Sequence, residues 1–185
     1  YDGHDRVETQ TAVGTPNLVT TFEYDGLNRQ VRVADPKGIV SRTDYDLAGR
    51  RTGLTEDEGG TKERVTGFAY NRLSQLITQT AQNKTSAGAA LADQVTTFRY
   101  DTLGRQRRAI YPDSTNVNPP ETCTDCVRTE YDDAGRMATR TDQRDLTTAY
   151  TYDRRGLMLT RTTGTVLDTW NYDAIGRPVL ADRGT

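Results

Sequence analysis

The sequence predicts an all-β fold: tandem β-hairpins that form one continuous antiparallel sheet, which twists and coils because strands twist right-handedly. Three observations support this. A Tyr-Asp-x-x-Gly-Arg motif recurs along the 185 residues. Runs of alternating Thr, Val and aromatic residues precede the motif, and this period of two is typical of strands. Only 34% of the residues are hydrophobic and the mean hydropathy is -0.79, so we expect a sheet buried on one face at most.

The motif recurs at short intervals, which is the signature of a repeat architecture. Its spacing ranges from 20 residues (152 to 172) to 31 residues (100 to 131). We expect residues 1–185 to form a single array of about eight hairpin units, and the chain to be a piece of a longer protein because it opens inside a repeat. The units start near Tyr1, Tyr24, Tyr45, Tyr70, Tyr100, Tyr131, Tyr152 and Tyr172.

The strands of a unit lie on either side of its motif. Residues 19–24 and 95–100 are outgoing strands of the alternating type, and residues 136–141 and 157–162 are return strands. No segment predicts a convincing helix. The residue two places before each motif Tyr shares its face of the strand. Five of these seven residues are aromatic: the set is Phe22, Thr43, Phe68, Phe98, Thr129, Tyr150 and Trp170.

The motif itself has the chemistry of a turn. The Asp side chain can accept a hydrogen bond from the backbone two residues on, and Gly adopts a positive φ without steric cost. A type I turn that closes into a left-handed bulge would join the two strands. The residues at the position of that Gly are Asp5, Asn28, Gly49, Ser74, Gly104, Gly135, Gly156 and Gly176.

We assign the repeat residues structural roles and predict no catalytic, cofactor or metal site. The Tyr side chains could bind sugar rings, but stacking between neighbouring strands is favoured. The Asp side chains could be catalytic or bind calcium, but one carboxylate per turn favours a turn-forming role. The Arg side chains, Arg29 included, could contact phosphate or cargo, but ladders with Asp or Glu of the next hairpin are favoured. The assigned residues are Tyr24, Asp25, Tyr45, Asp46, Gly49, Arg50, Tyr100, Asp101, Gly104, Arg105, Tyr131, Asp132, Gly135, Arg136, Tyr152, Asp153, Gly156, Tyr172, Asp173, Gly176 and Arg177.

Two cysteines, Cys123 and Cys126, lie in a polar insertion over residues 112–126. We favour a disulfide that clamps this loop, with free thiols, or a metal or redox site, as alternatives. A zinc site needs four ligands, and the only histidine, His4, is far away in sequence.

The charge distribution disfavours several classes of partner. The chain has 24 basic and 26 acidic residues without a basic stripe, so no nucleic-acid partner is predicted. No run of 18 apolar residues is present, so no membrane-spanning helix is predicted. No constellation of residues indicates an enzyme.

The tetrads, the preceding Thr-x-aromatic-x-Tyr runs and the period of about 20 residues resemble the RHS/YD-repeat family. This family includes bacterial Rhs polymorphic toxins, the C subunits of Tc toxins, wall-associated proteins and animal teneurins. The resemblance implies that the sheet is a spiralling segment of a β-shell. It also implies a structural role in a secreted, extracellular or cell-envelope protein, whose shell encloses or displays a passenger or toxin domain. It also implies an alternative, an extracellular binding or adhesion scaffold that recognises a glycan or a cell-surface protein. An exposed terminal strand edge further predicts possible edge-to-edge self-association.

Overall fold

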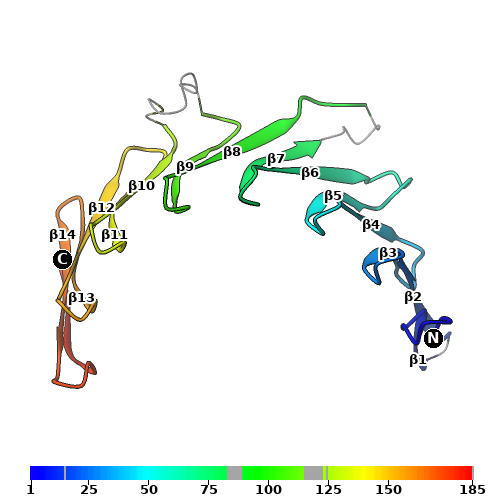
Figure 1. Ribbon diagram of the computed structural model, residues 1–185, viewed down its shortest axis with the longest axis horizontal. Helices are drawn as coiled ribbons and strands as arrows, with labels where there is room; N and C mark the ends of the chain where they lie inside the picture. Colours follow the sequence, from blue (N-terminus) through cyan, green and yellow to red (C-terminus); the bar gives the residue numbers. More distant parts are fainter. Residues whose placement is uncertain (15, 83–88, 115–122, 124, 185) are drawn as a thin grey trace. The chain divides into compact units, whose positions relative to one another are not determined.

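The computed structural model describes residues 1–14, 16–82, 89–114, 123 and 125–184, which contain fifteen β-strands and no helix. These strands belong to two compact units, Tyr1–Val95 and Thr96–Thr185. In both units the strands follow one another in the order of the sequence, and each is antiparallel to its neighbours (Figure 1). The predicted all-β class of tandem antiparallel hairpins is confirmed.

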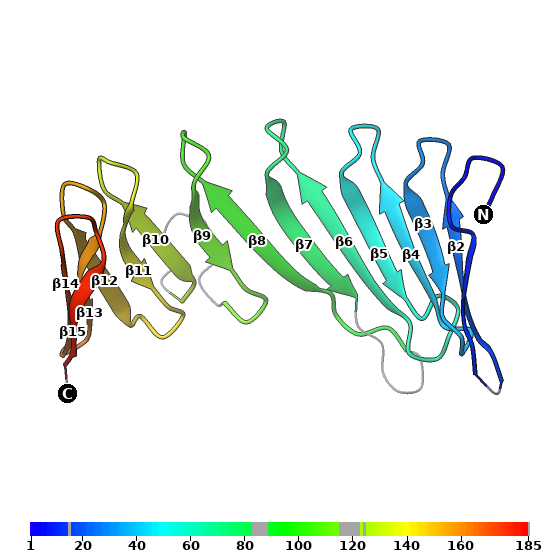
Figure 2. The ribbon, with the colours of Figure 1, turned by 90° about the horizontal axis from the view of Figure 1, so that it is seen from below.

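The first unit contains seven complete strands, and successive strands pair with each other throughout. Figure 2 shows the resulting row of hairpins, with the motif turns along one border of the unit. The strands are β1 (Thr9–Ala12), β2 (Leu18–Tyr24), β3 (Gln30–Ala34), β4 (Val40–Tyr45), β5 (Arg51–Glu56), β6 (Arg64–Tyr70) and β7 (Leu76–Gln82).

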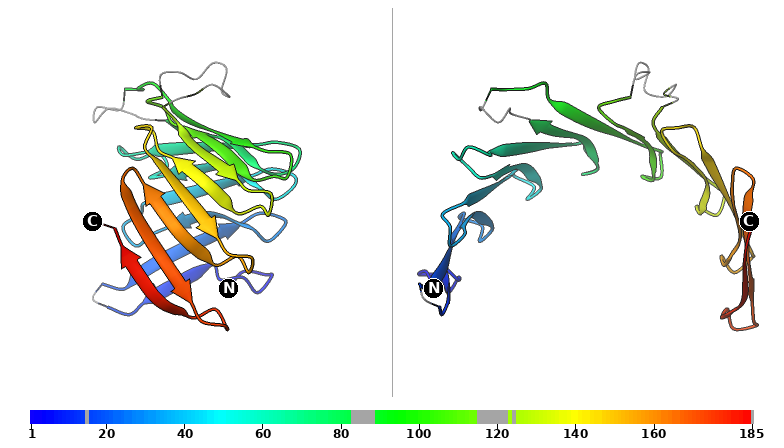
Figure 3. Two further views of the ribbon diagram at one scale, coloured as in Figure 1. Left: turned by 90° about the vertical axis from the view of Figure 1, so that its left-hand side faces the viewer. Right: turned by 180° about the vertical axis from the view of Figure 1, so that it is seen from behind.

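The second unit begins within β8 and repeats the same arrangement. Its last strands lie side by side at the orange-to-red end of the chain (Figure 3). The strands are β8 (Gln94–Tyr100), β9 (Gln106–Ile110), β10 (Val127–Tyr131), β11 (Met137–Thr141), β12 (Thr147–Tyr152), β13 (Met158–Thr163), β14 (Val166–Tyr172) and β15 (Pro178–Arg183). The strand expected over residues 95–100 agrees with β8 to within one residue. The agreement is close because an alternating pattern is a reliable mark of a strand.

Very little of the described chain is buried. Hydrogen bonds between strands and contacts between side chains of adjacent strands therefore hold the sheet, in place of a large apolar core. The buried residues are Ala109, Ile110, Cys123 and Cys126 among the hydrophobic ones, and Thr55, Thr129, Thr141 and Asp168 among the polar ones.

The motif turn has the geometry that its residues predict. In the second copy, the amide of Asn28 donates to the carbonyl of Asp25 (3.1 Å), and the amide of Asp25 donates to the carbonyl of Arg29 (2.9 Å). Asn28 has a φ of 62°. All eight residues at this fourth position have a positive φ, so the predicted type I turn with a left-handed closing residue is confirmed.

Each outgoing strand also has a pairing irregularity at its motif Tyr. In the β2–β3 pair, Glu23 lies opposite Arg32, whereas Tyr24 lies opposite Gln30. The same shift precedes Tyr45, Tyr131 and Tyr172. A bulge of this kind re-aims the neighbouring side chain, which here is that of the motif Tyr.

Within the described residues, the search for a helix long and apolar enough to cross a membrane finds none.

Candidate functional site

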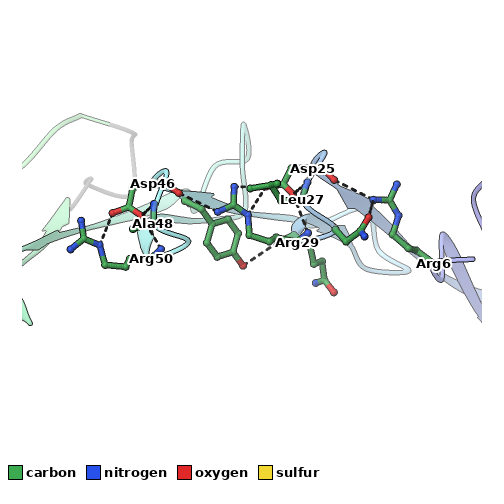
Figure 4. A network of polar contacts seen from close by, with 10 residues as sticks. Arg6, Asp25, Leu27, Arg29, Asp46, Ala48 and Arg50 are labelled. Atoms are coloured by element: carbon green, nitrogen blue, oxygen red, sulfur yellow. Dashed lines mark hydrogen bonds and ion pairs between the residues drawn. The ribbon is translucent and has the colours of Figure 1, made fainter. Parts of the chain in front are cut away.

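The motif carboxylate organises its own turn. The Oδ1 atom of Asp25 accepts hydrogen bonds from the amides of Leu27 (2.9 Å) and Arg29 (3.0 Å). Its Oδ2 atom accepts from Nε of Arg29 (2.7 Å) and lies 2.6 Å from Nη2 of the same guanidinium. Asp46 binds Ala48 and Arg50 in the same way, as Figure 4 shows. The carboxylate thus fixes both the turn and the direction of its Arg.

The oriented Arg then reaches the following hairpin. Nη1 of Arg29 donates to the carbonyl of Asp46 at 3.1 Å (Figure 4). Its guanidinium carbon lies 4.6 Å from the centre of the Tyr45 ring, a cation–π distance. The Tyr45 hydroxyl donates back to the carbonyl of Gln30 (3.3 Å), the residue that follows Arg29. We call these three contacts between successive hairpins the interlock.

The interlock recurs along both units. Guanidinium-to-ring distances lie between 4.4 and 4.9 Å for Arg6–Tyr24, Arg29–Tyr45, Arg50–Tyr70, Arg105–Tyr131 and Arg136–Tyr152. The hydroxyls of Tyr24, Tyr45, Tyr70, Tyr131, Tyr152 and Tyr172 each donate to a carbonyl of the preceding hairpin.

Two sequence-based expectations are therefore wrong. The motif Tyr rings were expected to stack on one another, but a guanidinium group lies over the rings of Tyr24, Tyr45, Tyr70, Tyr131 and Tyr152. The motif Arg side chains were expected to form ladders with carboxylates of the next hairpin. Instead, Arg29, Arg50 and Arg136 each pair with the Asp of their own turn and donate to a backbone carbonyl of the next turn. The physical reason is the turn geometry, which brings the Arg within reach of the Asp four residues before it.

Two degenerate motifs keep part of these contacts with other side chains. In the seventh unit Leu157 stands where the motif has Arg, and Arg155 pairs with Asp153 and donates to the carbonyl of Asp173 (3.0 Å). In the fourth unit the charged pair is replaced by two amides, since Nδ2 of Asn71 donates to Oε1 of Gln75 (2.6 Å). The bond across the turn is thus maintained in both units although the residues differ.

The fourth turn position faces the Arg of the preceding hairpin. Where this position is Asn28 or Ser74, its side-chain oxygen accepts a further bond, from Arg6 (2.8 Å) and Arg50 (3.2 Å) respectively. Where it is Gly135, a Cβ atom would lie 3.4 Å from Nη1 of Arg105. Glycine therefore provides both the positive φ and the space for the neighbouring guanidinium.

The turn contacts make the motif carboxyl groups stronger acids. The hydrogen bond from the Arg6 side chain lowers the pKa of Asp2 from 3.8 to about 2. The side-chain hydrogen bond from Arg29, with two backbone amides, lowers the pKa of Asp25. The pKa is also lowered at Asp46, Asp101, Asp132, Asp142, Asp153 and Asp173.

The lowered pKa values predict that the stability of the fold is retained in mild acid and then falls steeply as the pH is lowered further. A carboxyl whose pKa is lower in the folded state stabilises the fold above its unfolded pKa of about 3.9 and ceases to do so as pH falls through the folded value. We expect urea midpoints to be flat from neutral pH to about pH 5 and then to fall toward pH 2. Urea titrations followed by circular dichroism at constant ionic strength measure this. A decline that is already complete above pH 5 would contradict the prediction.

The cysteine pair directly precedes β10, since Cys126 is the residue before Val127. Cys123 and Cys126 are 2% and 0% exposed, their Cα atoms are 5.9 Å apart, and the structure joins their sulfur atoms as a disulfide. The carbonyl of Cys123 accepts a bond from Arg128 (3.3 Å), and the hydroxyl of Ser114 donates to the carbonyl of Asp125 (3.1 Å). We propose that the disulfide clamps the insertion onto β10. Residues 115–122 and Thr124 lie outside the described residues.

The disulfide is tested by alkylating the denatured protein with iodoacetamide, with and without prior reduction, and measuring the intact mass. We expect no adduct before reduction and two after it. Because each sulfur is buried, a Cys126→Ser variant should show one reactive thiol only after denaturation. Two adducts on protein that was denatured but never reduced would favour the free-thiol alternative.

Among the described residues, no three His, Cys, Asp or Glu side chains come together in a way that could hold a metal ion. Each motif Asp already accepts hydrogen bonds from backbone amides and from a guanidinium group. In the seventh unit this guanidinium is that of Arg155.

The fold and the interlock define a class of structural repeat protein, in which hairpins are linked to one another by side chains of their turns. Residues 24–62 match the family model described as RHS Repeat, and the resemblance to the RHS/YD-repeat family is confirmed. No curated protein sequence matches the chain.

Solved structures of Tc toxin complexes share the fold. A crystal structure of TcdB2-TccC3-Cdc42 matches with a TM-score of 0.67 and 18% identity, over 91% of this chain and 9% of that one. A variant of the Photorhabdus luminescens Tc holotoxin pore matches with a TM-score of 0.68 and 18% identity, over 91% and 8%. A crystal structure of TcdB2-TccC3 matches with a TM-score of 0.68 and 18% identity, over 91% and 9%. The chain thus spans less than a tenth of the length of these three structures.

Proposed function

We propose that residues 1–185 are a single YD-repeat array that serves as part of the wall of a β-shell, in a secreted or toxin-delivery protein of the extracellular space or cell envelope. The wall encloses or displays another domain of the same parent protein. The observation that carries this proposal is the interlock, which fastens hairpin to hairpin through the turn residues. The likeness of the fold to Tc toxin complexes supports it.

The interlock suits a wall for a physical reason. Side-by-side strands satisfy one another's backbone groups, and contacts between neighbouring units add up along a repeat array. Arg29, for instance, joins its own turn to the next through both a carbonyl bond and a ring contact. Stiffness therefore comes from the borders of the hairpins, and the faces of the sheet remain free for weak, polar contacts with a passenger.

No catalytic role is proposed for the repeat residues. The motif Tyr, Asp and Arg side chains are used in turn and interlock contacts, and this supports a structural role for each. Because a terminal strand edge offers unpaired backbone groups, we also propose that the isolated segment can associate edge to edge.

The wall function is tested on the full reading frame of the parent protein. Any non-repeat domain that it encodes should resist proteinase K in the intact protein and be cleaved rapidly when expressed alone. A second preparation carries Arg136→Ala, which removes one interlock, and Arg154→Ala serves as the matched control because Arg154 is an exposed turn residue. We expect faster cleavage of the domain in the Arg136 variant only.

Equal cleavage rates for the enclosed and the isolated domain would overturn encapsulation. A domain that is cleaved readily but remains bound to the repeat array would support display in place of enclosure.

A further inference from the structure

The pairing between β9 and β10 is the shortest that the described residues record. It consists of two residue pairs, Val127 with Ala109 and Arg128 with Arg108. The other recorded pairings have between three such pairs, as in β3–β4 and β11–β12, and six, as in β6–β7. Because hydrogen bonds and side-chain contacts between strands hold this sheet, a junction of two residue pairs is a weak point of the second unit.

The two ends of this junction are held by different contacts. At the motif border, the hydroxyl of Tyr131 donates to the carbonyl of Gln106 (3.0 Å), and the Arg105 guanidinium lies 4.4 Å from the Tyr131 ring centre. The opposite end has no motif turn that could provide an interlock, since the insertion over residues 112–126 connects the strands there. A small apolar cluster is buried at that end, and its members are Ile110, Cys123 and Cys126.

The disulfide restrains the turn from which β10 starts. Cys126 directly precedes Val127, and its bond to Cys123 closes this part of the chain into a small ring. The carbonyl of Cys123 also accepts a hydrogen bond from Nη1 of Arg128 (3.3 Å), one of the two β10 residues that pair with β9. Breaking the S–S bond removes the ring and leaves fewer restraints on this end of the junction, so local opening becomes easier.

The surroundings of the two sulfur atoms also suit the reduced form. Reduction places a proton on each sulfur, and a buried donor needs an acceptor. Sγ of Cys126 lies 3.4 Å from the carbonyl oxygen of Cys123, and Sγ of Cys123 lies 3.6 Å from Oδ1 of Asp125. Each thiol therefore finds an acceptor without rearrangement of the turn, and the dithiol can persist in the folded chain.

We propose that Cys123 and Cys126 form a reversible thiol–disulfide exchange site, whose oxidation state decides how firmly β10 is held on β9. The proposal rests on the disulfide assigned above and does not depend on an enclosed passenger. It gives the array one junction that loosens under reducing conditions, while the interlocks, which contain no sulfur, are unaffected.

The reaction partner is a dithiol reductant, which supplies two electrons and two protons. A thiolate of the reductant attacks one cysteine sulfur, the S–S bond breaks, and the other cysteine leaves as a thiolate. The second thiol of the reductant then displaces the first cysteine, so that the reductant leaves as a cyclic disulfide and both cysteines end as thiols. Because both sulfurs are buried, the turn must open before the attack, and exchange is slower than at an exposed disulfide.

The test compares hydrogen exchange of the 185-residue chain in three states: oxidised, reduced with dithiothreitol, and reoxidised. Exchange is measured by NMR at one pH and temperature. We expect the amides of the β9–β10 pairing to exchange roughly tenfold faster in the reduced chain and to recover on reoxidation. Amides of the β4–β5 pairing, in the first unit, should not change. A double variant, Cys123→Ser with Cys126→Ser, should exchange like the reduced chain with or without dithiothreitol.

Three results would overturn the proposal. Equal exchange at the β9–β10 pairing in the oxidised and reduced chains would show that the disulfide does not hold this junction. Faster exchange in β4–β5 as well would show a general loss of stability in place of a local one. A disulfide that dithiothreitol cannot break in the folded chain would exclude an exchange site. All three are measured on the unmodified chain, so the test stands even if the double variant fails to fold.

Discussion

Replacing Arg136 with alanine is expected to loosen the array at one hairpin junction. Nη1 of Arg136 donates to the carbonyl of Asp153 (2.9 Å), and the guanidinium lies 4.8 Å from the Tyr152 ring centre. Loss of a charged hydrogen bond and a cation–π contact should destabilise the fold by about 1–3 kcal/mol. The measurement is the urea midpoint, combined with hydrogen exchange of the β10–β13 amides.

The control and a double-mutant cycle make this prediction specific. Arg154→Ala removes an exposed Arg two residues after Tyr152 and should change stability by less than about 0.5 kcal/mol. Combining Arg136→Ala with Tyr152→Phe, which removes the hydroxyl bond to Met137 (2.9 Å), should cost less than the sum of the single changes if the contacts act together. Strict additivity would contradict a coupled interlock.

Replacing Gly135 with valine is expected to have a comparable or larger effect. Gly135 has a φ of 81°, a conformation that costs a residue with a Cβ atom roughly 1–2 kcal/mol. The new Cβ would also lie 3.4 Å from Nη1 of Arg105, so the preceding guanidinium must shift. We expect a lower urea midpoint and increased hydrogen exchange in β10 and β11.

Gly26→Ala is the matched control for a glycine in a motif turn. Its φ is not in the positive region and nothing lies within 4 Å of a Cβ at this position. Reduced freedom of the unfolded chain should therefore stabilise the protein by about 0.4–1 kcal/mol. If the Gly135 and Gly26 variants were destabilised alike, the loss would not come from the backbone conformation of the fourth position.

The strands and turns follow from local patterns, which is why the sequence predicts them closely. Alternation over residues 19–24 marks β2 to within one residue. Asp25 and Asn28 have turn chemistry that acts over four residues, and no distant contact is needed to interpret it. The type I turn and the positive φ values could therefore be expected in advance.

The contact partners of the motif Tyr and Arg side chains could not be predicted in this way. Tyr45 reaches Gln30 because a bulge shifts the pairing before it, and the sequence has no separate mark for that shift. Arg29 meets Asp25 because the turn folds back on itself, and only then can its Nη1 atom contact Asp46. Charge patterning alone favours a ladder between hairpins, which the structure does not contain at these positions.

The two cysteines stand out in the sequence because they lie in an insertion, whereas strand residues that meet across the sheet do not. Asp168 and Arg161 resemble any other charged strand residues until β13, β14 and β15 align them. The sequence by itself thus determined the hairpin repeat, because strands and turns depend on near neighbours. The tertiary structure decided how the hairpins interlock, because the Tyr hydroxyl bonds join residues 14 to 25 positions apart through bulges and strand register.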